Sequence, residues 1–158
     1  MNSSSGSLEL ALQAAVRRHL DPLVKQANAD AALLEGSRME KSQIRNVLNV
    51  AGESQSLAVV TNFIRYQLGR SQTGPAWQKK GFGLQVIEQI EKPDGIVPRL
   101  TKSIVEQVKE QFGEVPQEAI DDLRYDLMRY YLGYLNRAFY YGNETNKWDE
   151  LREAGEEG

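Results

Sequence analysis

The chain has 158 residues, of which 41% are apolar, and its net charge is −3. This length and composition suit one compact domain with a single hydrophobic core. There is no cysteine, which excludes a disulfide framework and a thiolate site. The apolar runs fall short of the roughly 18 residues that a membrane span needs, and no basic region with a long apolar core opens the chain. We therefore expect a cytoplasmic protein.

Charge is distributed unevenly along the chain. Residues 42–80 contain five basic residues and one acid, a net charge of +4, whereas residues 106–126 contain seven acids and two basic residues, a net charge of −5. A basic and an acidic segment within one small domain predict two different surfaces.

The first part of the chain predicts helices behind a polar leader. Residues 1–7 are small and polar, which predicts a flexible leader. Apolar residues then recur at helical spacing and predict an N-terminal helical extension over residues 8–36. Pro22 marks a helix restart within it, because proline is favoured in the first helical turn.

Residues 40–142 predict a helical bundle. One helix is expected to begin at Ser42 as its N-cap and a second to end at Gly69, while residues 71–80 are rich in turn residues and predict a mobile loop. The strongest helical stripe ends at Gly142. No segment alternates with period two, so the predicted fold is all-α, a compact bundle of about five helices with an N-terminal helical extension. Residues 143–158 are expected to form an acidic C-terminal tail.

The sequence lacks the residues that most catalytic and metal sites need. His19 is the single histidine, which excludes two-histidine zinc motifs within one chain. Asp121, Asp122 and Asp126 could supply carboxylates for a hard cation, but acids near a helix start stabilise the helix dipole and usually face water. We therefore expect no enzyme activity, no metal and no cofactor.

Basic residues in the +4 segment are the strongest functional signal. Arg65 and Arg70 have no acid at helical spacing, and Arg45 has none closer than Glu40. Unpaired guanidinium groups suit phosphate, because their planar fork bridges phosphate oxygens. Charge alone leaves two readings open, a polyanion-binding surface and a solvated basic face. The candidate phosphate contacts of such a polyanion-binding surface are Arg45, Arg65, Arg70, Lys79 and Lys80.

Aromatic residues supply a second type of candidate contact. Exposed rings can stack on unpaired bases, and we name Trp77 and Tyr141 as the stacking candidates. The alternative is that the aromatic residues pack in the core or at its boundary, with each tyrosine hydroxyl kept in water.

Four short motifs occur in a fixed order between residues 40 and 142. They are Ser42-Gln43-Ile44-Arg45-Asn46, Phe63-Ile64-Arg65-Tyr66-Gln67-Leu68-Gly69-Arg70, Gly81-Phe82-Gly83 and Tyr130-Tyr131-Leu132-Gly133-Tyr134. In this order they resemble the small helical subunit of type III CRISPR effector complexes, which serve antiviral defence.

The resemblance implies a non-catalytic small subunit that stacks in several copies and contacts the backbone of guide and target RNA beside the backbone and large subunits. Arg45 and Arg70 match motif positions, and Arg65 lies in the same helix as Arg70. The N-terminal extension and the acidic tail depart from the pattern, which suggests a variant joined to, or derived from, a larger backbone subunit. The alternative function is a helical protein–protein adaptor or regulator that binds no nucleic acid.

Overall fold

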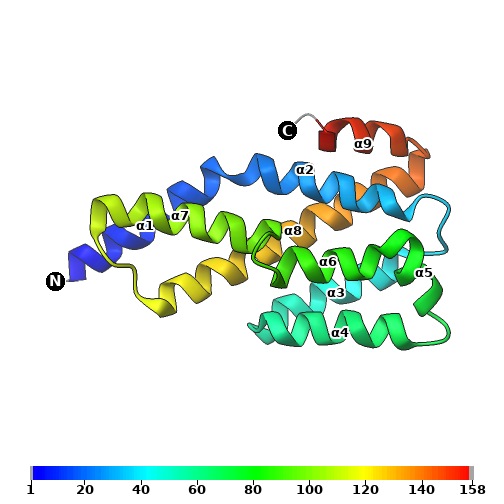
Figure 1. The fold of residues 1–158 in the computed structure, drawn as a ribbon, viewed down its shortest axis with the longest axis horizontal. Coiled ribbons are helices and arrows are strands. Elements are labelled where there is room, and N and C mark those ends of the chain that lie inside the picture. Colours follow the sequence, from blue (N-terminus) through cyan, green and yellow to red (C-terminus); the bar gives the residue numbers. More distant parts are fainter. Residues whose placement is uncertain (1, 157–158) are drawn as a thin grey trace.

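The computed structural model describes residues 2–156, and the fold is all-α, as predicted. The described residues form nine α-helices and two short 3-10 helices (Figure 1), and the six α-helices that begin between residues 40 and 142 compare with the about five predicted for the bundle. None of these helices is long and apolar enough to cross a membrane. The elements are α1 (Asn2–Arg18), α2 (Leu20–Ala31), η1 (Ala32–Leu34), α3 (Lys41–Ser54), α4 (Leu57–Gly69), α5 (Gly74–Gln78), η2 (Lys79–Gly81), α6 (Phe82–Glu91), α7 (Ile96–Phe112), α8 (Gln117–Thr145) and α9 (Trp148–Glu156).

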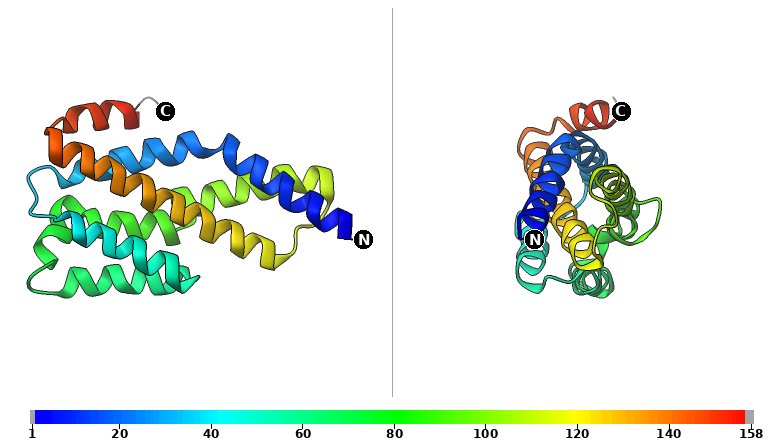
Figure 2. Two further views of the ribbon diagram at one scale, coloured as in Figure 1. Left: turned by 180° about the vertical axis from the view of Figure 1, so that it is seen from behind. Right: turned by 90° about the vertical axis from the view of Figure 1, so that its left-hand side faces the viewer.

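Helix α8 is the central element of the fold. It crosses the molecule along its long axis, as the left view of Figure 2 shows, and packs against α2, α3 and α7. Its predicted apolar stripe is buried, with Leu127 and Met128 fully inaccessible. Helices α3 and α4 form an antiparallel hairpin on one side of α8, and α6 and α7 continue the bundle.

The residues predicted as a separate N-terminal extension belong to the main core. Leu23 and Ala27 of α2 are fully buried against the bundle. Asp30, also on α2 and 2% exposed, accepts a hydrogen bond from the Tyr131 hydroxyl of α8 at 2.5 Å and from Gln26 and Gln85 at 3.1 and 3.3 Å. A buried carboxylate needs such donors because it has lost its hydration. Helix α2 is therefore locked to α8 and α6.

The start of the described chain differs from the sequence expectation, whereas the end forms the short helix that Trp148 and Leu151 predict. Helix α1 begins at Asn2 and so includes most of the predicted leader, because each residue added to an existing helix gains a backbone hydrogen bond. The predicted acidic tail contains α9, which packs on α2 and buries Trp148 and Leu151. The Trp148 ring covers Gly142, where a Cβ atom would overlap it. Apolar anchors thus hold this acidic segment against the bundle.

Local sequence chemistry sets the α3–α4 hairpin. Glu40, and not Ser42, is the N-cap of α3, and it forms a reciprocal capping box with Gln43. Ser56 caps α4 through its hydroxyl, which accepts a hydrogen bond from the Val59 amide at 3.3 Å. Between the two helices, Gln55 takes the left-handed conformation that reverses the chain.

The segment predicted as a mobile loop is helical and anchored. Residues 74–78 form α5, and Trp77 is 1% exposed with its ring centroid 5.4 Å from that of Phe82. The Thr73 hydroxyl and the Gln78 amide donate hydrogen bonds to the last carbonyls of α4, at 2.9 and 3.0 Å. Burial of the large Trp77 side chain offsets the poor helix propensity of glycine and proline here.

Candidate nucleic-acid interface

Four of the five predicted RNA contacts lie at one end of the molecule. The antiparallel hairpin places the start of α3, with Arg45 in its second turn, and the end of α4, where Arg70 is the C-cap, at the same end of the molecule, and η2 with Lys79 and Lys80 follows α5 there (Figure 1). We call Arg45, Arg70, Lys79 and Lys80 the basic end. All four come from the +4 segment of residues 42–80, and the hairpin brings the start of α3 and the end of α4 to the same end of the molecule.

Arg45 lies where α3 meets the C-terminal part of α8. Its guanidinium group donates a hydrogen bond to the Tyr140 hydroxyl of α8, and its side chain is exposed. Lys41, one turn earlier on α3, forms an ion pair with Glu144 and lies 4.8 Å from the centroid of the Tyr140 ring. The Tyr140 hydroxyl orients Arg45 but is neutral, and Arg45 forms no ion pair with any residue between 2 and 156.

Arg70 is held by an aromatic ring instead of an acid. It is the C-cap of α4, and its guanidinium carbon lies 5.2 Å from the centroid of the Tyr66 ring. This cation–π contact preserves the positive charge and limits the number of side-chain conformations. Within the described part of the chain, Arg70 makes no ion pair.

Lys79 and Lys80 follow α5 in the short helix η2. Lys79 is half-buried with its amino group beside Gly36, whereas Lys80 is exposed and takes a positive φ of 49°. Neither lysine forms an ion pair with any residue between 2 and 156. Both charges are therefore available to an anion.

Arg65 is the predicted contact that the fold keeps apart from the basic end. It donates two hydrogen bonds to the carboxylate of Glu91 on α6, at 2.9 and 3.4 Å. The pKa of Glu91 lies below its usual value because hydrogen bonds from Thr61 and then Arg65 stabilise its charged form. This pair could not be predicted from helical spacing, since the partners are 26 residues apart on different helices.

The two stacking candidates differ in accessibility. Trp77 is buried, so its ring cannot reach a nucleobase in this fold, and that prediction is wrong. The large apolar ring is instead the anchor of α5. Tyr141 is 38% exposed, and its hydroxyl donates a hydrogen bond to Glu150 of α9.

The seam between α3 and α8 contains contacts that the sequence analysis missed. Tyr130 is 45% exposed and nearly parallel to Tyr134, with ring centroids 6.3 Å apart and an interplanar angle of 15°. Arg129 and Arg137 are exposed on the same helix. Residues 127–143 of α8 contain no acid. That acid-free run was visible in the sequence and could have identified this face.

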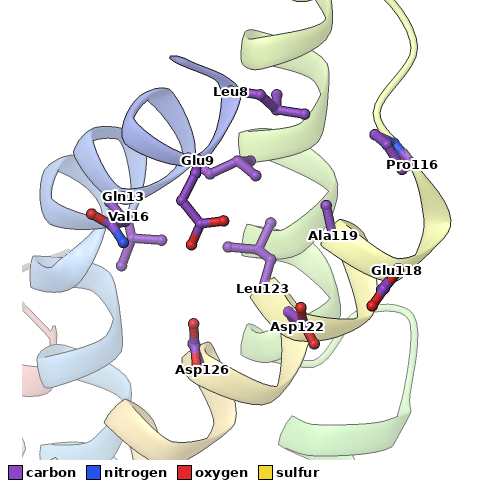
Figure 3. Close-up of a pocket in the computed structure, with 11 residues that line it drawn as sticks. Leu8, Glu9, Gln13, Val16, Pro116, Glu118, Ala119, Asp122, Leu123 and Asp126 are labelled. Carbon is purple, nitrogen blue, oxygen red and sulfur yellow. The ribbon is translucent and has the colours of Figure 1, made fainter. Parts of the chain in front are cut away.

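A groove of opposite character lies toward the other end of the long axis, between α1 and the start of α8. Its cavity of about 310 Å³ has apolar walls from Leu8, Leu12, Val16, Ala119 and Leu123, and Figure 3 shows carboxylates around it. We call this the acidic groove, and its acids are Glu9, Glu118, Asp122 and Asp126. Burial raises the pKa of Asp126; Arg129 opposes this rise, and Asp122 and Glu9 add to it.

Other chemistry is sparse among residues 2–156. No group of three or more His, Asp or Glu side chains there has an arrangement suited to a metal ion. His19 lies at the junction of α1 and α2, and its Nδ1 donates a hydrogen bond to the Ala15 carbonyl at 2.7 Å. This residue therefore has a structural partner at the end of α1.

Comparisons of this chain with protein-family models, with curated proteins and with solved structures found no match. The function is therefore inferred from the residues and their geometry.

Proposed function

We propose that this chain is a non-catalytic scaffold subunit that binds the RNA backbone, as the small subunit of a type III CRISPR RNA-guided effector complex in the cytoplasm. One observation carries the proposal. Arg45, Arg70, Lys79 and Lys80 lie at one end of the bundle, and none of the four forms an ion pair with a described residue. The motif order between residues 40 and 142 supplies the family.

The mechanism of this subunit is positional. Guanidinium and ammonium groups neutralise phosphates, and the rigid hairpin fixes their spacing. Such contacts carry little sequence information, so the affinity for RNA is largely independent of sequence and falls steeply with salt. Cleavage belongs to a partner subunit.

The test is fluorescence anisotropy of a labelled single-stranded RNA with the full chain at several salt concentrations. Each phosphate contact contributes roughly 0.7 to the slope of log affinity against log salt. Arg45→Glu/Arg70→Glu should therefore lower the slope by about 1.4 and weaken binding. The matched control is Arg99→Glu/Lys102→Glu on α7, which makes the same change in net charge on another helix and should preserve the slope. Equal losses in the two double variants would contradict a localised site.

Neighbouring copies of the chain are part of this proposal. The basic end and the acidic groove lie toward opposite ends of the long axis (Figure 1). A head-to-tail arrangement brings opposite charges together and repeats without closing. Two charge reversals should each abolish self-association at low salt. One is Lys79→Glu/Lys80→Glu at the basic end, and the other is Asp122→Lys/Asp126→Lys at the acidic groove. Mixed together, the two variants pair an intact basic end with an intact acidic groove, and their two reversed ends are also opposite in charge, so the mixture should associate again, whereas two monomers would refute this geometry.

The acidic groove is also the observation that favours a second function, a helical protein–protein adaptor or regulator. Its apolar walls and acidic rim suit a partner protein with basic and apolar side chains. A protein partner that co-purifies after nuclease treatment, together with no binding of RNA at low salt, would favour the adaptor over the RNA scaffold.

A further inference from the structure

The seam between α3 and α8 encloses an open hollow beside Tyr130. Its cavity of about 370 Å³ is lined by Leu48 and Ala51 from α3 and by Asp126, Arg129 and Tyr130 from α8. Volumes of roughly 300–1,000 Å³ are typical of small-molecule sites. We call this cavity the Tyr130 hollow.

The walls of the hollow are held in place by neighbouring contacts. The Tyr125 hydroxyl donates a hydrogen bond to the Ala51 carbonyl and so ties α8 to α3 beneath it. The Tyr130 ring lies beside the half-buried, nearly parallel ring of Tyr134, and 45% of Tyr130 remains exposed. An aromatic ring fixed in this way stacks on a ligand with little loss of conformational entropy.

Polar groups surround this aromatic wall. The Arg129 guanidinium carbon lies 5.7 Å from the centroid of the Tyr125 ring, at the edge of the hollow. Arginine donates to the oxygen and nitrogen acceptors of a base, and a carboxylate such as Asp126 accepts from an exocyclic amino group. A nucleobase has apolar faces and polar edges. Leu48, Ala51 and the Tyr130 ring can contact its faces, and Arg129 as donor and Asp126 as acceptor can bind its edges.

The charges along the seam favour a polyanion over a neutral aromatic ligand. Asp126 lines the hollow on the side of the acidic groove, whereas residues 41–52 of α3 and 127–143 of α8, on the side of Arg45, contain no acid. Arg45 lies one turn before Leu48 on α3, and Arg137 lies two turns after Arg129 on α8. A strand with a base in the hollow can therefore place adjacent phosphates near two exposed guanidinium groups.

We infer that the Tyr130 hollow binds an unpaired nucleobase of single-stranded RNA, with the adjoining phosphates along the α3–α8 seam. This inference rests on the proposed RNA-binding function and adds the class of RNA to it. Bases in a duplex are stacked and paired, so they cannot enter the hollow. The protein accordingly prefers single-stranded over double-stranded RNA.

The experiment compares three labelled probes that share one backbone chemistry: a short single strand, the same strand annealed as a duplex, and a single strand with abasic residues and the same number of phosphates. Alanine replacement of a stacking aromatic residue costs about 1–3 kcal/mol per base, or roughly 5- to 150-fold in affinity. Tyr130→Ala should weaken binding of the intact single strand by that factor and leave the abasic strand unchanged. Tyr130→Phe keeps the ring and should retain wild-type affinity.

The matched control is Leu84→Ala, which truncates a 59% exposed apolar side chain on α6. It should preserve the preference of the protein for intact over abasic RNA. A 2-aminopurine base in the single strand gives a second readout, because its fluorescence should be quenched by wild type and not by Tyr130→Ala.

Two results would overturn the inference in different ways. If the intact and abasic strands bind equally, with the expected salt dependence, the phosphate scaffold stands and the base site is wrong. If none of the three probes binds at low salt, the proposed function fails and the base site fails with it.

Discussion

Loss of the buried hydrogen bond between Tyr131 and Asp30 should destabilise the whole bundle. Tyr131→Phe removes one hydroxyl from a fully buried ring and leaves Asp30 with the Gln26 and Gln85 donors. Hydrogen bonds to charged groups contribute about 1.5–3 kcal/mol, so we expect the free energy of unfolding at pH 8 to fall by about that amount. For a chain of this size the melting temperature should fall by roughly 3–12 °C.

The pH dependence separates this effect from lost packing. Burial raises the pKa of Asp30 above 3.8 in the folded state. A carboxyl group with a raised folded pKa binds its proton more tightly in the folded protein than in the unfolded chain. It therefore adds to the free energy of unfolding below its unfolded pKa, near 3.9, and this contribution disappears as the pH rises through the folded pKa. The Tyr131 hydrogen bond lowers this folded pKa, so Tyr131→Phe should extend the loss to higher pH. At low pH the difference between variant and wild type should shrink to about 0.5–1.5 kcal/mol, the value of a neutral hydrogen bond.

Urea unfolding followed by circular dichroism across a pH series measures both quantities. Tyr134→Phe on the same helix is the control, because the Tyr134 hydroxyl makes no hydrogen bond with any described residue, and it should change stability by less than about 0.5 kcal/mol. A Tyr131→Phe protein as stable as wild type at pH 8, or one whose deficit does not depend on pH, would refute the role assigned to the pair.

Three further substitutions test how the fold positions its surfaces. Gly142→Ala places a methyl group against the Trp148 ring, which should cost about 1–3 kcal/mol and expose the α8–α9 turn to limited proteolysis; an unchanged cleavage pattern would contradict the close packing of α9. Trp77→Ala empties the anchor of α5 and should lower the free energy of unfolding in urea by about 3–5 kcal/mol, and a loss below 1 kcal/mol would show that the segment is not anchored there. Ser56→Ala removes the cap of α4 and should cost about 1 kcal/mol, whereas Ser71→Ala, at an exposed turn, should cost almost nothing.

The sequence predicted those parts of the fold that depend on local periodicity. The buried stripe of α8 and the end of α4 at Gly69 follow from patterns within one helix. The anchoring of α5 does not, because glycine and proline near Trp77 indicate a turn, while burial against Phe82 depends on tertiary packing. Position along the chain likewise could not show that α9 would dock on α2.

The candidate site shows the same division between local and long-range information. Sequence order supplied Arg45 and Arg70 as basic residues without nearby acids. It could not supply Glu91 as the partner of Arg65, since that pair joins two different helices. Nor could it show that Tyr130 stands beside a hollow while Trp77 is buried, because both are aromatic residues in helical segments.

Helix α8 carries the acidic groove near its start and the Tyr130 hollow farther along one uninterrupted rod of 29 residues, about 43 Å long. Because each residue turns the helix by about 100°, one residue inserted between Asp122 and Tyr130 would rotate the hollow to a different side of the molecule from the groove. An insertion of seven residues would nearly restore the direction and lengthen the distance by about 10 Å. Asp126 borders both cavities, so the helix fixes the distance and the rotation between the acidic groove and the neighbouring Tyr130 hollow at its middle.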